Sequence, residues 1–332
     1  MIDLTVVWAG IIAFAVMAYV VMDGFDLGIG ILFPRLKVGD ERDVAMNSIA
    51  PVWDGNETWL VLGGGGLMAA FPLAYAIVLP ALYAPLTAML LGLVLRGVAF
   101  EFRWREPGHR AAWDAAFTTG SLVATFAQGI TLGALLQGIT IEGRAYAGGW
   151  WDWLTPFSML TGLALCIAYA LLGACWLAMK TEGALQDQAF RHARMLAVAL
   201  VAVIGLVSAA TPFLESQYYQ RWFAWPGLLV AAPMPLLVLG AGFMLWRALG
   251  RRQERAPFLW ALALFGLCFV GLAISIWPDV IPGRVTIWQA AAPEKSQIFM
   301  LVGAVVLVPV ILAYTAWAYW VFRGKVDSHG YH

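Results

Sequence analysis

The sequence predicts an all-α, polytopic membrane protein with nine transmembrane helices in one domain, residues 1–332. Two observations carry this prediction. Of the 332 residues, 62% are hydrophobic and 12% are charged, and the mean hydropathy is +0.78, which lies outside the range of soluble globular domains. Apolar segments long enough to cross a bilayer, about 20 residues each, also recur along the whole chain. The connections between them are short, and none has a hydrophobic core of its own.

The predicted spans follow one another with little connecting sequence. They are residues 5–33, 58–73, 76–100, 114–138, 155–179, 195–214, 226–247, 257–277 and 297–322. Only a short turn near Pro72 and Tyr75 separates the second span from the third, so this boundary is the least sharply defined. The first span is long and has neither a basic leading region nor a small-residue cleavage site, so we expect no cleavable signal peptide.

The distribution of Lys and Arg predicts the orientation, because these residues are retained on the cytoplasmic side of a membrane. Fifteen fall in alternate connections and the tail: Arg35, Lys37, Arg42, Arg103, Arg105, Arg110, Lys180, Arg191, Arg194, Arg247, Arg251, Arg252, Arg255, Arg323 and Lys325. The opposite side has four: Arg144, Arg221, Arg284 and Lys295. We therefore expect a periplasmic N-terminus and a cytoplasmic C-terminus. The cluster of Trp150, Trp151 and Trp153 at an outer boundary fits this orientation.

Redox ligands are sparse in the predicted spans. Haem iron is usually held by His, Met or Cys, but His109, His192, His329 and His332 all fall in cytoplasmic connections or the tail. The three cysteines, Cys166, Cys175 and Cys268, have no Cys-x-x-Cys spacing and are interpreted as packed thiols. The 12 methionines are read as packing residues. We expect no metal site and no haem ligands on this chain, and no basic, aromatic-rich loop indicates nucleic acid binding.

Four acidic residues lie in or beside the predicted spans, where burying a charge costs free energy. Asp23 and Asp26 fall in the cytoplasmic half of the first span, and a charge at membrane depth costs roughly 2.5–3.5 kcal/mol on insertion scales. Their spacing of three places them on neighbouring parts of one helix face. Asp54 and Glu57 repeat that spacing at the cytoplasmic entrance to the second span. Such residues normally face a bundle interior, form ion pairs or line a pathway.

A third polar group completes the pattern. Arg96 and Glu101 lie at the cytoplasmic end of the third span, so all three groups converge on one side of the membrane. Structural roles remain open: Asp54 as the N-cap of the second span, Asp23 and Asp26 as solvated helix-end acids paired with a loop arginine, and Arg96 as a counter-ion. From the residues alone we infer a protein that handles a proton or cation on its cytoplasmic side.

Small and amide residues predict how the helices pack. Gln128 and Gln137 in the fourth span are expected to form hydrogen bonds between helices. Close-packing faces are expected at the glycines, namely Gly24 with Gly28, Gly129 with Gly133, and the run Gly63–Gly66.

Several motifs carry a family resemblance along the whole chain. They are VMDGFDLGIG at 21–30, NSIAPVWDGNETWL at 47–60, LRGVAFEFR at 95–103, the Trp and Gln of TIWQAA at 286–291, and VPVILAYTAWAYW at 308–320. The chain resembles subunit II of the cytochrome bd-type quinol oxidases, and its compact length and short outer loops are more similar to the cyanide-insensitive branch. The resemblance implies nine spans arranged as two four-helix bundles plus one peripheral helix.

The resemblance also implies a division of labour in a bacterial inner membrane. Subunit I holds two b-type haems and haem d and binds and oxidises quinol, whereas this subunit has no haem, supports the haem region and helps deliver protons and, as a further suggested role, oxygen. The complex reduces O₂ to water and builds a proton gradient from cytoplasmic protons without pumping. Expected partners are subunit I, small single-span accessory subunits and membrane lipid. Some members of the family also carry a structural quinone in this subunit.

The resemblance assigns roles to individual residues. Asp54 matches the aspartate of the WDGN motif implicated in proton uptake, and Glu57 follows that motif where some members have an uncharged residue. The expected proton pathway consists of Asp54, Asp23, Asp26, Glu101 and Glu57. The expected structural and interface residues are Trp53, Asn56, Trp59 and Arg96.

Two other classes of protein remain as alternatives. A proton-coupled secondary transporter would also have many spans and buried acids, although we expect it to place them near the bilayer midplane. A purely structural assembly subunit would use the acids only to cap helices. The gathering of the acids at one face favours a half-channel that ends on a partner's cofactor.

Overall fold

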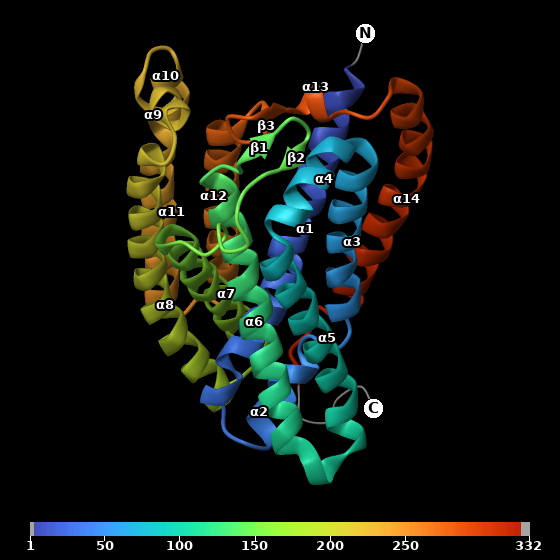
Figure 1. Ribbon diagram of the computed structural model, residues 1–332. Helices are drawn as coiled ribbons and strands as arrows, with labels where there is room; N and C mark the ends of the chain where they lie inside the picture. The colour runs from blue at the N-terminus through green and yellow to red at the C-terminus, as the bar shows by residue number, and fades with distance from the viewer. Residues whose placement is uncertain (1–2, 327–332) are drawn as a thin grey trace.

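The computed structural model describes residues 3–326, and it is almost entirely helical (Figure 1). The helices are α1 Leu4–Leu32, α2 Asp40–Asn47, α3 Trp53–Ala70, α4 Pro72–Ala81, α5 Tyr83–Arg105, α6 Arg110–Leu136, α7 Pro156–Lys180, α8 Gly183–Ala210, α9 Ser216–Phe223, α10 Gly227–Ala231, α11 Pro233–Gly250, α12 Ala256–Ile276, α13 Ile287–Ala290 and α14 Glu294–Val321. Two antiparallel hairpins join β1 Ile141–Glu142 to β2 Ala145–Tyr146, and β3 Asp279–Ile281 to β4 Val285–Thr286.

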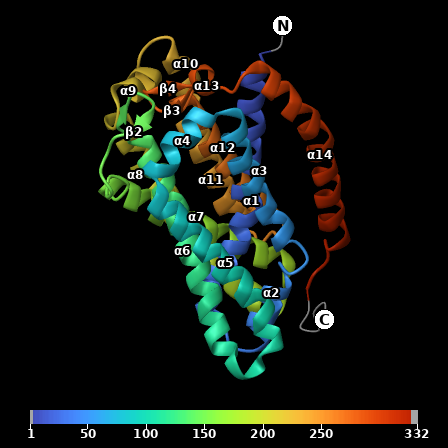
Figure 2. The ribbon, with the colours of Figure 1, turned by 45° about the vertical axis from the view of Figure 1, so that its right-hand side comes forward.

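Within the described residues, nine helices run between the two ends of the molecule: α1, α3, α5, α6, α7, α8, α11, α12 and α14 (Figures 1 and 2). Eight of the spans are long and apolar enough to cross a membrane on their own, and α3 reaches that threshold together with α4. Both hairpins, α4, α9, α10 and α13 lie at one end, whereas α2 and the α5–α6 turn lie at the other. The predicted all-α class and span pattern are confirmed.

The predicted turn near Pro72 is confirmed, but the bounds of the second and third spans differ from the prediction. The second span begins at Trp53 rather than at residue 58, and the chain then bends by 119° between α3 and α4. Pro72 begins α4, as expected for a residue that lacks a backbone N–H and suits the first helical position. A second break at Leu82 separates α4 from α5. The prediction of one unbroken helix over 76–100 is therefore wrong.

Helix α8 also extends further than predicted. It begins at Gly183 rather than at residue 195, because its polar first turns continue the helix beyond the apolar stretch. His192 consequently lies inside a helix, near its start, rather than in a connection. His109 is exposed at the α5–α6 turn, and the other two histidines lie outside the described residues.

The long helices form two groups of four and one outlier. Helices α1, α3, α5 and α6 form the first bundle, and α7, α8, α11 and α12 form the second. Helix α14 stands apart, as Figure 2 shows, and none of its most apolar stretch is buried. The predicted arrangement of two bundles plus one peripheral helix is confirmed.

Glycines set the distance between the two bundles. A Cβ added to Gly173 of α7 would lie 2.6 Å from the carbonyl carbon of Gly28 on α1, and one added to Gly24 would lie 2.8 Å from the Tyr169 ring. The backbones of α1 and α7 therefore touch, which only glycine permits. Gly92 of α5 meets Gly120 of α6 in the same way, with 2.8 Å from the added Cβ to the Gly120 carbonyl oxygen.

The other glycines follow the prediction in part. Gly129 of α6 packs against Thr161 and Gly162 of α7, with 2.5 Å from an added Cβ to the Thr161 oxygen. Gly133 likewise contacts α7, so this pair is confirmed. In the Gly63–Gly66 run, Gly63 and Gly66 face α1, but a Cβ on either of the two middle glycines would meet no atom of the described chain within 4 Å. Half of that run therefore points away from the bundle.

The contact between α1 and α7 yields a stability prediction. In Gly173→Ala the added methyl group meets the α1 backbone, which cannot yield as a side chain would, so the bundles must separate. We expect a loss of about 1–3 kcal/mol, the usual cost of overpacking. The readout is the temperature at which purified protein loses its helical circular dichroism signal. Gly205→Ala in α8 is the control, because its Cβ would meet open space; equal transition temperatures for the two variants would contradict this account.

The charge distribution yields a topology prediction. The fifteen basic residues counted above all belong to elements at the end that carries α2 and the α14 C-terminus, and the other four belong to hairpins or helices at the opposite end. A reporter fused after His332 is therefore expected to give a cytoplasmic signal, and one inserted near Gly148 a periplasmic signal. The reverse pattern would invert the side from which the acids take up protons.

Candidate functional site

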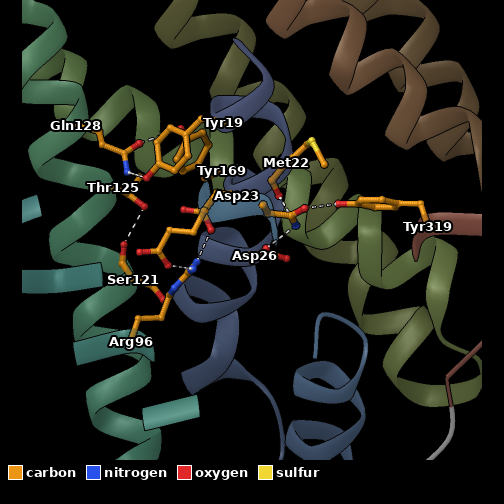
Figure 3. A network of polar contacts seen from close by, with 12 residues as sticks. Tyr19, Met22, Asp23, Asp26, Arg96, Ser121, Thr125, Gln128, Tyr169 and Tyr319 are labelled. Atoms are coloured by element: carbon orange, nitrogen blue, oxygen red, sulfur yellow. Dashed lines mark hydrogen bonds and ion pairs between the residues drawn. The ribbon is translucent and has the colours of Figure 1, made fainter. Parts of the chain in front are cut away.

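Arg96 of α5 lies at the centre of a buried ion cluster in the first bundle (Figure 3). Its Nη1 donates to Asp23 Oδ1 of α1 at 2.6 Å, and its Nη2 donates to Glu57 Oε2 of α3 at 3.0 Å. The side chains of Arg96 and Asp23 are 2% and 0% exposed, whereas that of Glu57 is 30% exposed. The indole of Trp53 lies 5.9 Å from the guanidinium carbon. One cation therefore joins three helices, and only the Glu57 side of the cluster reaches the surface of this chain.

Asn56 links the cluster to the peripheral helix. Its Nδ2 donates to Asp26 Oδ2 at 2.8 Å and to the Met22 carbonyl at 3.2 Å, and its Oδ1 accepts from the Tyr319 hydroxyl of α14 at 2.8 Å. These partners fix the orientation of the amide, because the NH₂ group faces two acceptors and the oxygen faces a hydroxyl donor. Asp26 is fully buried and meets no cation directly. Asn56 therefore positions a carboxyl that has no counter-ion of its own.

A third polar chain extends from α1 toward the second bundle. Gln128 of α6 donates to the Tyr19 hydroxyl at 2.7 Å and accepts from the Tyr169 hydroxyl of α7 at 3.0 Å (Figure 3). Tyr19 lies one turn before Asp23 on the same helix face. Gln128 thus makes the predicted interhelical bonds, and Gln137, the C-cap of α6, accepts a hydrogen bond from Thr155, the N-cap of α7. Neither Tyr19 nor Tyr169 was predicted. The spacing of four residues between Tyr19 and Asp23, which places them on one helix face, is the sequence feature that indicates a role for Tyr19.

The charges of the cluster do not balance when every group is ionised. Asp23, Asp26 and Glu57 supply three carboxyls against the single Arg96 guanidinium, and neutrality requires two protons on the carboxyls. Unbalanced charge in a buried site is expensive, several kcal/mol per ion. Among the described residues, Asp23 Oδ2 and Asp26 Oδ1 have no hydrogen-bond partner, so each offers a position for a proton. The cluster can chemically bind and release protons.

Two structural interpretations of the acids are wrong. Asp23 is fully buried and pairs with Arg96 within the bundle rather than being solvated at a helix end. Asp54 is not an N-cap, because Val52 occupies that position and no side-chain cap forms. Asp54 is the second residue of α3, where a carboxylate meets the positive end of the helix dipole. The interpretation of Arg96 as a counter-ion is confirmed by its two ion pairs.

The remaining predicted residues surround the cluster at different depths. Asp54 is exposed, one turn before Glu57, and no side chain within residues 3–326 forms a hydrogen bond or ion pair with it. Glu101 lies outside the cluster, is 55% exposed and pairs with Arg105 at 3.7 Å. Trp59 is buried beside Tyr19, edge-on to Phe14. Trp53 stacks on Phe100 with ring centroids 5.1 Å apart, so both tryptophans pack within this chain.

A second ion network closes the same end of the bundle, and the sequence reasoning missed it. Arg103 of α5, 1% exposed, contacts Asp114 of α6 at 2.5 Å and Asp43 of α2 at 2.8 Å. Arg42 adds a 2.7 Å contact to Asp114. The Phe33 ring lies 5.3 Å and 5.6 Å from the guanidinium carbons of Arg42 and Arg103. The network holds α2 against α5 and α6. Its partners are too far apart in sequence for residue spacing to predict that they form ion pairs.

The end of α14 is held by a separate contact. Lys180 of α7 donates to the carbonyls of Phe322 and Gly324, the latter at 2.8 Å. Lys325 contacts Glu254 at 3.0 Å, and hydrogen bonds from Lys325 and Gln186 lower the pKa of the Glu254 carboxyl. These contacts secure the helix that delivers the Tyr319 hydroxyl to Asn56.

The described residues include no clustered metal ligands, and their three cysteines are free thiols. Within residues 3–326, no group of three or more His, Cys, Asp or Glu side chains is arranged to hold a metal ion. Cys166 and Cys175 are buried free thiols, as predicted, whereas Cys268 is exposed on α12. The interpretation of Cys268 as a packed thiol is therefore wrong.

Comparison with known proteins identifies the family. The family model described as "Cytochrome bd terminal oxidase subunit II" matches residues 4–322. The chain is 31% identical to the "Probable cytochrome oxidase subunit 2" of Haemophilus influenzae and 30% identical to the "Cytochrome bd-I ubiquinol oxidase subunit 2" of Escherichia coli K12, in each case over 97% of this chain and 95% of the relative. It is 30% identical to the "Cytochrome bd ubiquinol oxidase subunit 2" of Bacillus subtilis, over 96% of both chains.

A solved structure supports the fold. A chain of the bd oxidase from Geobacillus thermodenitrificans superposes with a TM-score of 0.78 over 97% of this chain and 99% of its own length, at 18% identity. The eight or more apolar helices and these relatives make the protein a multi-pass component of the bacterial inner membrane. They also favour an oxidase subunit over a secondary transporter. The chain belongs to the cytochrome bd terminal oxidase subunit II family.

Proposed function

We propose that this chain is the haem-free subunit of a bd-type quinol oxidase and that it carries protons through the Arg96 cluster toward the oxygen-reducing site of subunit I. Reduction of oxygen to water at the partner's haems consumes protons. The observation that carries the proposal is the set of three carboxyls around one guanidinium at membrane depth. Burying surplus carboxyls is costly unless they take up protons.

The differing exposure of the acids supports a direction of transfer. Asp54 and Glu101 are exposed at the end that carries most of the basic residues, and they collect protons there. Glu57 is the only member of the cluster with a substantially exposed side chain, so it receives protons from Asp54, one turn away. Asp23 and Asp26, fully buried, hold them inside the bundle.

The role of Arg96 in this scheme is electrostatic. It bonds to Asp23 and Glu57 through separate nitrogens, so a proton that arrives at one carboxyl weakens one ion pair and leaves the other intact. The guanidinium itself stays protonated throughout, because arginine is not deprotonated in proteins. Arg96 therefore stabilises the deprotonated carboxyls of the cluster without blocking the exchange of protons among them.

The exposed face of α3 suggests where subunit I binds. Asp54 is exposed without a partner in the described chain, and the same helix exposes Val61, Gly64, Gly65 and Met68. Lipid would leave the Asp54 carboxylate without a polar partner, whereas a second subunit can supply one. We therefore place subunit I against this face, and the two outward-facing glycines leave room for its close approach.

Substitution of Asp54 tests the proposal in the complete oxidase, purified with subunit I. In Asp54→Asn the side chain keeps its shape but cannot exchange a proton, so oxygen consumption per haem is expected to fall at least about tenfold, equivalent to roughly 1.4 kcal/mol of barrier. Haem content is expected to stay unchanged and Asp54→Glu to be partly active. Oxygen uptake with excess quinol, at several pH values, provides the measurement.

The control is Asp187→Asn, because Asp187 is also an acid at the basic end, 49% exposed and paired with Arg252, but it lies in the second bundle. Its turnover is expected to match the wild type. Wild-type turnover in Asp54→Asn would remove Asp54 from the pathway, and loss of haem would show that it holds the subunits together instead.

A further inference from the structure

An apolar groove lies between α11 and α12, in the second bundle and away from the Arg96 cluster. It has a volume of about 520 Å³. It is lined by Leu236, Leu237, Gly240, Ala241, Met244, Trp260, Ala263, Gly266 and Leu267. A Cβ added to Gly240 or Gly266 would meet no atom of the described chain within 4 Å. These small residues thus leave a groove that no side chain of the described chain fills.

The groove leads to a group of cations. On α11 the lining residues Leu237, Gly240 and Met244 recur at spacings of three and four, which places them on one helix face. The same series continues to Arg247 and Arg251 at the end of the helix. On α12, Trp260, Ala263 and Leu267 form the facing series, and the helix starts directly after Arg255. The groove therefore runs toward the arginine-rich α11–α12 connection.

The α11–α12 connection contains more cations than its acidic residue can pair with. Arg252 pairs with Asp187, and Glu254 pairs with Lys325. The side chains of Arg247 and Arg251 are exposed and form no hydrogen bond or ion pair within residues 3–326. Arg255 is exposed at the same end. Because Glu254, the acidic residue of the connection, already pairs with Lys325, the guanidinium groups of Arg247 and Arg251 are available to an anion.

We propose that the groove and its arginines bind one anionic phospholipid of the surrounding bilayer, with an acyl chain between α11 and α12 and the phosphate near Arg247 and Arg251. Basic pockets between transmembrane helices suit anionic headgroups, and arginine forms bidentate bonds with phosphate. Trp260, at the basic end of the groove, suits the boundary between headgroup and acyl chain.

The length of the groove favours a lipid over a helix. From Leu236 to Met244 it extends about 12 Å, at roughly 1.5 Å of helix rise per residue. A single-span helix of an accessory subunit crosses about 30 Å of hydrocarbon and would extend well past both ends of the lined region. An acyl chain enters such a short groove from the side while its headgroup stays at the arginines.

Native mass spectrometry of the oxidase purified with subunit I tests the proposal. Delipidated complex is titrated with phosphatidylglycerol and, separately, with phosphatidylcholine of the same acyl chains. We expect one phosphatidylglycerol to bind at least about tenfold more tightly than phosphatidylcholine. The double variant Arg247→Gln/Arg251→Gln is expected to remove that preference, and Gly240→Leu, which fills the groove, is expected to weaken both lipids. Inorganic phosphate at equal concentration is expected not to displace the lipid, since it lacks an acyl chain.

Two control variants make the outcome decisive. Arg191→Gln removes an exposed cation at the start of α8, and Gly205→Leu enlarges an exposed glycine with open space around it; neither is expected to change binding. Equal affinity for the two lipids, or a preference that survives the double arginine variant, would overturn the proposal. Crosslinking of a Gly240→Cys variant to a polypeptide in native membranes would also overturn it, because a protein would then occupy the groove.

Discussion

The structure of the first bundle depends on one interaction, the pairing of a single buried guanidinium with carboxyls from two other helices. Arg96 holds Asp23 and Glu57 at 2.6 Å and 3.0 Å, and Asn56 brings Asp26 of α1 into a network with Tyr319 of α14. Removing one partner of a buried pair usually costs about 3–5 kcal/mol, because the other charge is left uncompensated. The cluster thus fixes helix positions, and its surplus carboxyls also give it capacity for protons.

The glycine contact between the bundles serves the same network. Because Gly24 and Gly28 have no side chains, α7 approaches α1 closely enough for the Tyr169 ring to lie over α1 and for its hydroxyl to reach Gln128. Packing and polar chemistry are therefore coupled: a side chain at Gly24 would collide with the ring that donates to Gln128. The two bundles share one polar interior along α1, and they pack against each other where α1 and α6 contact α7.

The apolar segments predicted the class and the nine spans, the family resemblance implied the two bundles, and the intramembrane charges predicted part of the Arg96 cluster. Apolar length and the cost of charge at membrane depth are local signals, and they located Asp23, Asp26 and Arg96 correctly. The pairing of Arg96 with Asp23, 73 residues apart, follows from helix packing that no local pattern encodes. The same limit explains why Asp43, Asp114, Tyr169 and Tyr319 were missed. The bend between α3 and α4 lies at Pro72, where the sequence predicted a turn. The second break, at Leu82, lies within an apolar stretch and has no hydropathy signal.

Infrared spectroscopy of the purified oxidase tests the central claim, that the Arg96 cluster holds a proton inside the bundle, most directly. A protonated carboxyl has a C=O stretching band distinct from that of a carboxylate, and the band shifts when H₂O is replaced by D₂O. Asp26 is the buried acid without a direct cation partner, so the account predicts that the wild-type spectrum contains such a band, that Asp26→Asn loses part of its intensity, and that Asp187→Asn retains all of it. An unchanged protonated-carboxyl band in Asp26→Asn, in a complex with normal haem content, would contradict the account.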